Sequence, residues 1–209
     1  MNNVSLLEPF VPPGIAPVLV DWLKRYNVKL TITRKRYSKF ADYSPPAEKP
    51  YHRITVNHNL NPWSFLISLV HEMAHMFTWV KYRNSVTPHG IQWHGEFRRT
   101  ITPFLRNNIF PEDIRIAIDK HLQKYFASSC TDPDLMRILT KYDKPSAKIR
   151  VENLVQGEQF MYKGILYRRE EKARKNYNCL RVSDNRKYRF SPVAEVVKVQ
   201  ANKKQAQAG

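Results

Sequence analysis

The sequence is poor in cysteine, and it has no long apolar run. The two cysteines, Cys130 and Cys179, form no C-x-x-C pair, which excludes a cysteine zinc ribbon and a disulfide framework. The longest apolar run, residues 65–70, is interrupted by Ser68 and is too short to cross a bilayer. The first residues lack the basic and apolar regions of a secretory signal. We therefore expect a cytoplasmic protein without a membrane segment.

Acidic residues are also scarce: 18 Asp and Glu stand against 35 Lys and Arg, which gives a formal net charge of +17. Such an excess favours an anionic partner, nucleic acid first, although a soluble enzyme that is merely basic is the alternative. Residues 144–209 hold 16 Lys and Arg against 6 Asp and Glu, so this shorter part carries more than half of the excess. The 209 residues are 42% hydrophobic, which is enough for one globular domain and a small appendage.

A predicted helix that begins after Asn61 is the centre of the chain. Asn61 is a good N-cap, and Pro62 suits the first helical position. Apolar residues then recur at helical spacing and form one stripe: Trp63, Leu66, Ile67, Val70, Ala74 and Phe77. His71 and His75 lie on a different face, one turn apart, within an H-E-x-x-H run. They can hold one zinc ion with Glu72 beside a water; two solvent-facing histidines are the alternative.

A catalytic zinc needs a third protein ligand and one open position, and three later residues are candidates. His89 lies in a Thr-Pro-His-Gly turn, which can bring its side chain back over the first helix. Glu96 would lie well inside the next predicted helix, residues 90–106. His94 is the second choice after His89, and it is otherwise interpreted as a residue behind the ligands or on the surface.

The run H-E-M-A-H followed by P-H-G-x-x-W resembles the SprT-like (SprT/Spartan-like) zinc metalloproteases, a family that includes DNA-dependent proteases of DNA–protein crosslink repair. The resemblance covers about residues 15–106. It implies that Glu72 is the general base. It also implies a Zn2+ cofactor with three ligands: His71, His75 and His89.

The same resemblance implies the fold, α+β with a zincin-like metalloprotease domain of helices and a small sheet, assigned here to residues 1–143. Its substrate would be a protein associated with DNA. In zincin-like folds an edge strand borders the cleft and pairs with extended substrate backbone, a role that would fall near residues 52–58. Sequence patterns in this part predict helices at 15–26, 90–106, 111–127 and 134–142, strands at 28–36 and 51–57, an extended arm at 1–13 and a loop at 39–50.

Residues 143–150 are the predicted linker, and a small basic β-rich module is predicted for residues 144–200, with a disordered tail at 201–209. Its strands are predicted at 159–162, 165–168, 177–182, 187–190 and 194–199. Aromatic residues alternate with basic ones in these strands, which is typical of a platform for single-stranded DNA but also of a small β core. The predicted nucleic-acid-binding residues are Arg168, Arg169, Lys172, Arg174, Lys175, Lys187 and Arg189. Several SprT-like proteins carry a cysteine zinc ribbon in this place, which this chain lacks.

The predicted function is therefore a zinc-dependent metallopeptidase in which Glu72 takes a proton from a water that zinc has acidified to a pKa of roughly 7, then passes it to the leaving amine. His94 and Tyr43 are candidates for the oxyanion donor. One alternative is a nucleic-acid-binding protein with a structural or vestigial zinc site, whose fourth position a side chain would fill. Another is a zinc hydrolase with a substrate other than protein.

Overall fold

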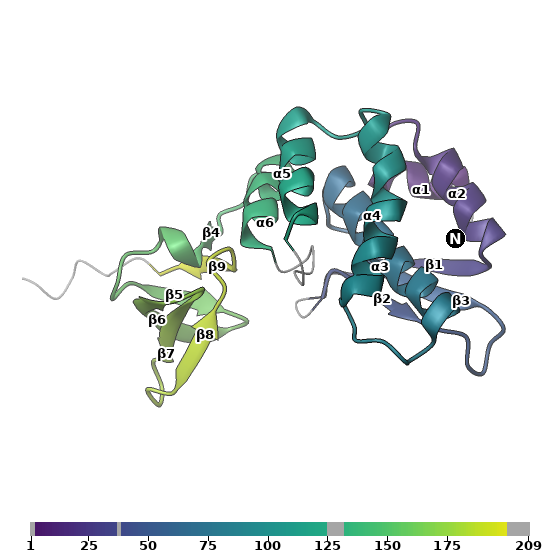
Figure 1. Cartoon of the computed structure of the whole chain (residues 1–209). Coiled ribbons are helices and arrows are strands. Elements are labelled where there is room, and N and C mark those ends of the chain that lie inside the picture. Colours follow the sequence, from purple (N-terminus) through teal and green to yellow (C-terminus); the bar gives the residue numbers. More distant parts are fainter. Residues whose placement is uncertain (1–2, 37–38, 125–131, 200–209) are drawn as a thin grey trace, which may run out of the picture. The chain divides into compact units, whose positions relative to one another are not determined.

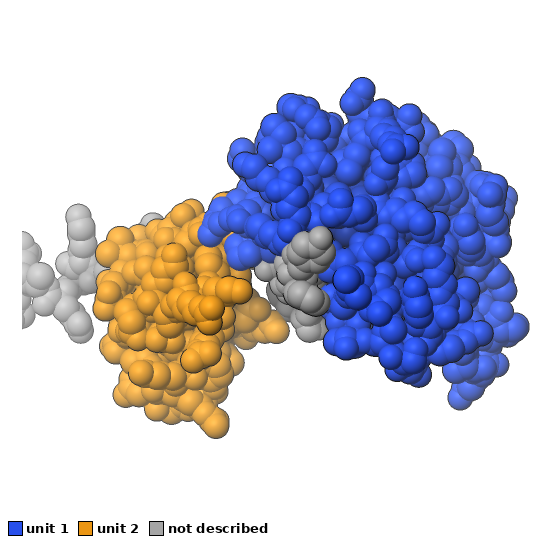
Figure 2. Space-filling model, viewed as in Figure 1, with its two compact units in different colours: residues 1–143 blue, residues 144–209 orange. Residues whose placement is uncertain are grey.

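The computed structural model describes residues 3–36, 39–124 and 132–199, and the chain divides into two compact units, residues 1–143 and 144–209 (Figures 1 and 2). The division falls at the start of the predicted linker, and each unit has its own buried apolar core. Two sequence predictions lie outside the described residues: the tail at 201–209 and the end of the helix predicted at 111–127.

Unit 1 is mixed α+β (Figure 1). In chain order it contains α1 (Val4–Leu7), η1 (Glu8–Phe10), α2 (Ala16–Arg25), β1 (Val28–Thr33), β2 (Ala41–Ser44), β3 (His52–Asn57), α3 (Pro62–Tyr82), α4 (Ile91–Arg106), α5 (Glu112–Leu122), α6 (Pro133–Leu139) and η2 (Thr140–Tyr142). The prediction of an extended arm at residues 1–13 is wrong, because Leu7 and Val11 are buried in the core and the arm is partly helical. Among the described helices, none combines the length and the apolar content that crossing a membrane requires.

The sheet of unit 1 has the strand order β1-β3-β2. β3 pairs with β1 in parallel, with Val28 opposite His52, and with β2 in antiparallel, with Ala41 opposite Val56. The edge-strand role expected near residues 52–58 is therefore wrong, since β3 is paired on both sides. β2 takes the edge instead, inside the segment predicted as a loop, because its extended backbone is fixed by β3 and not by local preference.

The helix α3, which carries His71 and His75, begins as predicted. The Asn61 side-chain oxygen accepts from the backbone N–H of Ser64 at 2.9 Å, and Pro62 occupies the first helical position. The Asn61 amide also donates to the carbonyl oxygen of Leu139 at 2.9 Å and to the carboxylate of Asp143 at 2.6 Å. Apolar and small residues are buried on nearly every side of the helix, so α3 is a core helix and not a half-exposed one.

Unit 2 is a six-stranded sheet with the order β4-β9-β5-β6-β7-β8 (Figure 1). The strands are β4 (Ile149–Arg150), β5 (Gln159–Tyr162), β6 (Ile165–Ala173), β7 (Asn176–Arg181), β8 (Lys187–Phe190) and β9 (Glu195–Lys198), with the short helix η3 (Val151–Asn153) after β4. β5 and β8 match the predicted strands residue for residue. β6 is longer than predicted, because it continues past a bulge between Arg169 and Lys172.

Candidate metal centre

Three histidines of unit 1 converge on one point. His71 and His75 project from α3 one turn apart, and His89 comes from the turn that precedes α4. The Nε2 atom of His71 lies 3.1 Å from that of His89 and 3.2 Å from that of His75, and the remaining pair is 3.0 Å apart. These three residues are the predicted ligands, and the structure places all three together.

The turn at His89 depends on a close approach of the backbone. His89 has a φ of 57°, and Gly90, which caps α4, donates its N–H to the carbonyl oxygen of Thr87 at 3.0 Å. A Cβ atom at Gly90 would lie 2.9 Å from that oxygen, so a larger residue would displace the turn. The glycine after His89 therefore holds the third histidine over α3.

The chemistry of the three histidines fits a metal ion. Burial lowers the pKa of His71 well below its ordinary value, aided by the neighbouring histidines, and lowers that of His75 to about 4. Burial also lowers the pKa of His89, so all three rings are neutral at pH 7 and offer lone pairs. Tetrahedral zinc with Zn–N bonds of about 2.0–2.1 Å holds two nitrogens about 3.3 Å apart, close to the spacing seen here. The triad could thus hold a metal ion.

Trp93 on α4 forms the wall behind the triad. Its ring centroid lies 4.6 Å from that of His71, 5.4 Å from that of His75 and 4.8 Å from that of His89. The helical spacing of Trp93, Phe97 and Ile101 predicts that Trp93 faces inward, but nothing in the sequence indicates its contact with all three histidines. Its indole fixes the orientation of the three rings and excludes water behind them.

The two other ligand candidates lie elsewhere. His94 is 8% exposed and packs beside Trp93 and the ring of His121, so it is neither a surface residue nor a member of the triad. The Glu96 carboxylate forms ion pairs with Lys81 and Arg99, which explains why it is not a ligand. Within the described parts of the chain, no fourth His, Cys, Asp or Glu joins the triad.

Glu72 is a residue of α3, and its side chain faces the edge strand β2. Its side chain is buried, and burial is the main cause that raises its pKa to about 8; nearby Asp42 also raises it. Lys39, Arg36 and the backbone N–H of Tyr43, which faces the carboxylate, lower the pKa in part. A carboxyl group with a pKa near the working pH is suited to take up and return a proton.

Asn57, which sequence patterns did not single out, organises the basic side of Glu72. Its amide nitrogen donates to the backbone oxygens of Arg36 at 3.2 Å and Lys39 at 2.9 Å, and its oxygen accepts from the Arg36 guanidinium at 2.8 Å. Asn57 is 1% exposed, so these bonds are shielded from water. Arg36 and Lys39 are thereby held near Glu72.

The side chain of Tyr43 is engaged by a neighbour. Its hydroxyl lies 2.9 Å from Nδ1 of His52, within hydrogen-bonding distance, and burial raises the pKa of Tyr43, so the hydroxyl keeps its proton. The His52 ring also meets Trp79 edge-on at 5.7 Å, and the guanidinium of Arg83 lies 4.0 Å above the Trp79 ring. Trp79 is one turn beyond His75 on α3, so this aromatic cluster borders the triad.

The predicted nucleic-acid-binding residues of unit 2 are divided between two faces of its sheet. Strand register places Arg168 in one row with Leu180 and Lys187, and the next row on the same face holds Arg189. Arg169 lies on the opposite face, with its guanidinium 4.4 Å from the Tyr177 ring, and Lys172 also approaches that ring. Arg174 and Lys175 are exposed at the turn between β6 and β7.

The aromatic residues of unit 2 are mostly core. Tyr167 and Tyr177 are buried, and they share this core with Phe160 and Phe190, whose rings meet edge-on at 5.3 Å. The alternation of aromatic and basic residues thus builds a β core on one side of the sheet. In the described strands β5–β8, the register places no aromatic residue on the side that carries Arg168, Lys187 and Arg189.

Three comparisons with known proteins were made: a scan against models of protein families, a search of curated proteins and a search of solved structures. None of the three finds a match to this chain. The function of the chain is therefore inferred from the residues and geometry of the site itself.

Proposed function

We propose that this chain is a zinc-dependent metallopeptidase of the SprT-like type that acts on proteins associated with DNA. The observation that carries the proposal is the convergence of three neutral histidine nitrogens beside Glu72, a buried carboxyl group on the same helix with a raised pKa. The H-E-x-x-H and P-H-G-x-x-W motifs support it, since they resemble that family.

The residues of the site have distinct roles in peptide hydrolysis. His71, His75 and His89 would hold zinc, which when bound supplies Lewis acidity that acidifies a water and polarises the scissile carbonyl. Glu72 accepts the proton of the attacking water and passes it to the amine that leaves when the C–N bond breaks. Trp93 excludes water behind the ligands.

Edge strand β2 is suited to hold the substrate backbone. Among the described residues, β2 pairs with β3 alone, so its outer edge keeps free backbone groups. The Tyr43 N–H faces the Glu72 carboxylate and not β3, so this edge of the sheet lies toward the general base. An extended peptide that adds to β2 would lie beside Glu72 with its side chains alternating to either face.

The test is cleavage of a DNA-bound basic protein by the zinc-loaded chain, with and without single-stranded DNA. Glu72→Gln is the inactive comparison, and His58→Ala, which changes an exposed histidine outside the triad, is the matched control. Cleavage that requires DNA and Glu72, and that His58→Ala retains, supports the proposal. The absence of cleavage in every lane, with zinc and DNA both bound, would refute it and favour a binding protein with a structural zinc.

A further inference from the structure

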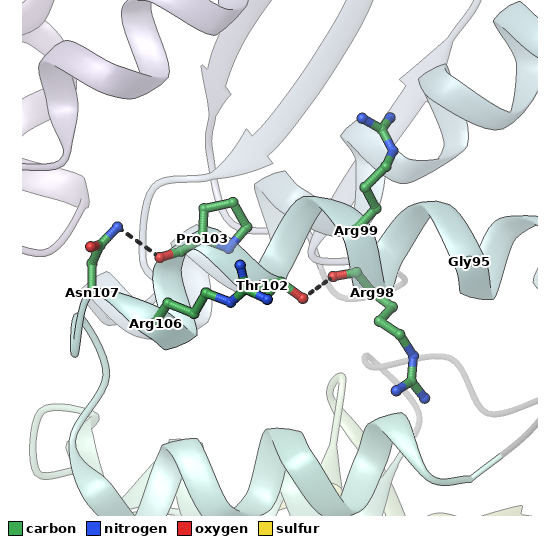
Figure 3. A pocket seen from close by; sticks show the side chains of 7 residues that line it. All are labelled: Gly95, Arg98, Arg99, Thr102, Pro103, Arg106 and Asn107. Carbon is green, nitrogen blue, oxygen red and sulfur yellow. Dashed lines mark hydrogen bonds between the residues drawn. The ribbon is translucent and has the colours of Figure 1, made fainter.

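The exposed side of α4 carries a basic hollow that the metal centre does not use. Five residues at helical spacing line it, and we call them the Gly95 stripe: Gly95, Arg98, Arg99, Thr102 and Arg106. Pro103 and Asn107 complete the lining, and the hollow has a volume of about 630 Å³ (Figure 3). The spacing i, i+3, i+4, i+7 and i+11 places the stripe on one face of the helix.

Two arginines of the stripe are held in place on opposite sides. Figure 3 shows the Arg98 and Arg99 side chains leaving the helix in different directions. The Arg98 guanidinium donates to the backbone oxygen of Leu122 at 2.6 Å, and that of Arg99 donates twice to Glu96 and lies 4.8 Å above the Phe77 ring. Fixed guanidinium groups lose little freedom when they bind an anion.

The positive charge of the hollow is only partly cancelled, by the ion pair between Arg99 and Glu96. No carboxylate is among the residues that line it, and Arg106 forms no ion pair within the described ranges. Acidic residues of the neighbouring α5 are already engaged, because Arg115 pairs with Glu112 and Asp119, and Asp113 accepts from the Tyr142 hydroxyl at 2.6 Å. Arg99 is paired with Glu96, whereas Arg98 donates to a neutral backbone oxygen, so Arg98 and Arg106 carry the positive charge that the stripe presents to solvent.

Gly95 has no steric reason to be glycine. It lies inside α4, where glycine weakens a helix relative to alanine, yet a Cβ atom added there would meet no atom within 4 Å. Its φ is not in the left-handed region, so the backbone does not require glycine either. What the missing side chain leaves is open space beside the helix between two arginines, which lets a ligand approach the backbone closely.

We propose that the Gly95 stripe binds the phosphate backbone of a single nucleic-acid strand. This deepens the proposed function, on which it rests for its setting, by placing a DNA-binding surface on the peptidase unit itself. Arg98 and Arg106 are eight residues apart, or about 12 Å along a helix, so their guanidinium groups can contact different phosphates of one strand. One guanidinium group can donate two parallel hydrogen bonds to the oxygens of one phosphate. No large apolar residue lines the hollow, so it lacks the side chains that would insert into a lipid surface.

The test measures binding of a labelled single-stranded oligonucleotide to the full chain over a series of salt concentrations. Arg106→Gln is expected to weaken binding and to reduce the salt slope by about 0.7, the contribution of one phosphate contact. Gly95→Ala is expected to raise the melting temperature, because alanine favours helix, and still to weaken binding. Arg25→Gln, which removes the same charge from α2, is the matched control and should leave the affinity unchanged.

Three results would overturn the inference. The first is unchanged affinity and slope in both α4 variants, or no binding by the unaltered chain in low salt. The second is an equal loss in Arg25→Gln, which would show a general charge effect. The third is a loss confined to anionic phospholipid vesicles, which would assign the stripe to a membrane. Zinc stoichiometry and Glu72-dependent peptide cleavage, measured without nucleic acid on the same preparations, report failure of the proposed function separately.

Discussion

The backbone N–H of Tyr43 faces the carboxylate of Glu72 and lowers the pKa of that group. This contact links the edge strand β2 to the helix α3 at the residue that would act as the general base. The orientation of Glu72 therefore depends on the position of a strand as well as on its own helix. A peptide added to the outer edge of β2 would be brought beside the Glu72 carboxyl group by the same contact.

Glu72→Gln should abolish peptide cleavage and leave the metal content unchanged, because Glu72 is not a ligand and glutamine cannot take up the proton. The folded pKa of Glu72 is about 8, above its unfolded value, so its favourable contribution to stability is present at low pH and lost as the pH rises through 8. The metal-free variant should then be at least as stable as the unaltered protein at pH 8. Metal analysis, a peptide assay and denaturant unfolding check this, and retained cleavage by metal-replete protein would contradict it.

His89→Ala should lose the metal, because it removes one of three converging nitrogens and opens the turn before α4. His94→Ala is the matched control, since His94 is buried beside Trp93 but lies outside the triad. It should keep one metal ion per chain. Metal stoichiometry after dialysis distinguishes the two, and unchanged stoichiometry in His89→Ala would show that another residue completes the site.

Acid should destabilise the metal-free protein before most carboxylates titrate. Burial lowers the folded pKa of His71, His75 and His89, and that of His75 to about 4, whereas unfolded histidine titrates near 6.5. As the pH is lowered, these histidines therefore take up protons at a higher pH in the unfolded chain than in the folded chain. The free energy of unfolding falls as the pH drops from about 6.5 to about 4. Zinc at a hundredfold excess over its Kd should raise that free energy by about 2.7 kcal/mol at pH 7, and a chelator should remove the gain. Thermal melts at a series of pH values measure this effect. A melting temperature that stays constant between pH 6.5 and pH 4 would argue against neutral buried histidines.

Arg83→Gly should be more stable than Arg83→Ala by about 1 kcal/mol, since both lose the contact with Trp79 but glycine alone relieves the backbone. Arg83 ends α3 with φ 54° and ψ −130°, a conformation that glycine adopts readily and other residues do not. Denaturant unfolding of the two variants provides the measurement. Equal stability would mean that the turn adjusts without strain.

In unit 2, Arg189→Gln should reduce oligonucleotide affinity, whereas Arg169→Gln should chiefly reduce stability. Arg189 is exposed on the open face of the sheet, while Arg169 stacks on the buried Tyr177. Fluorescence anisotropy and thermal melts of the full chain separate the two effects. The reverse pattern would place any nucleic-acid contact on the face that carries Tyr177.

Local sequence patterns predicted the elements whose signals are local. The start of α3 follows from Asn61 and Pro62, and the inward face of α4 follows from the spacing of Trp93, Phe97 and Ile101, which are all buried. The edge strand β2 was missed, because its short polar run beside prolines has no strand preference of its own. Its extended form comes from pairing with β3, a contact between segments that a local pattern does not contain.

The parts of the site that depend on helical spacing could be predicted from the sequence. The parts that depend on contacts between distant segments could not. The i, i+4 pair and the turn before Gly90 indicated the three histidines, and the structure places them together. The roles of Trp93 and Asn57 were not foreseen, since an inward tryptophan and a strand-end asparagine occur in many cores. In unit 2, alternating aromatics suit a binding face and a core equally, and only the packing of Phe160 and Phe190 distinguishes them.

Asn61 opens the helix α3, yet its amide is bonded to Leu139 and Asp143, which follow it by 78 and 82 residues. The smallest fragment that keeps this anchor therefore ends no earlier than Asp143. A proteolytic nick among residues 144–148 would separate the two units and leave the beginning of α3 intact. A nick shortly before Asp143 would free the beginning of α3 from this anchor. Cutting within the linker instead removes the basic module without loosening the helix that carries the histidines.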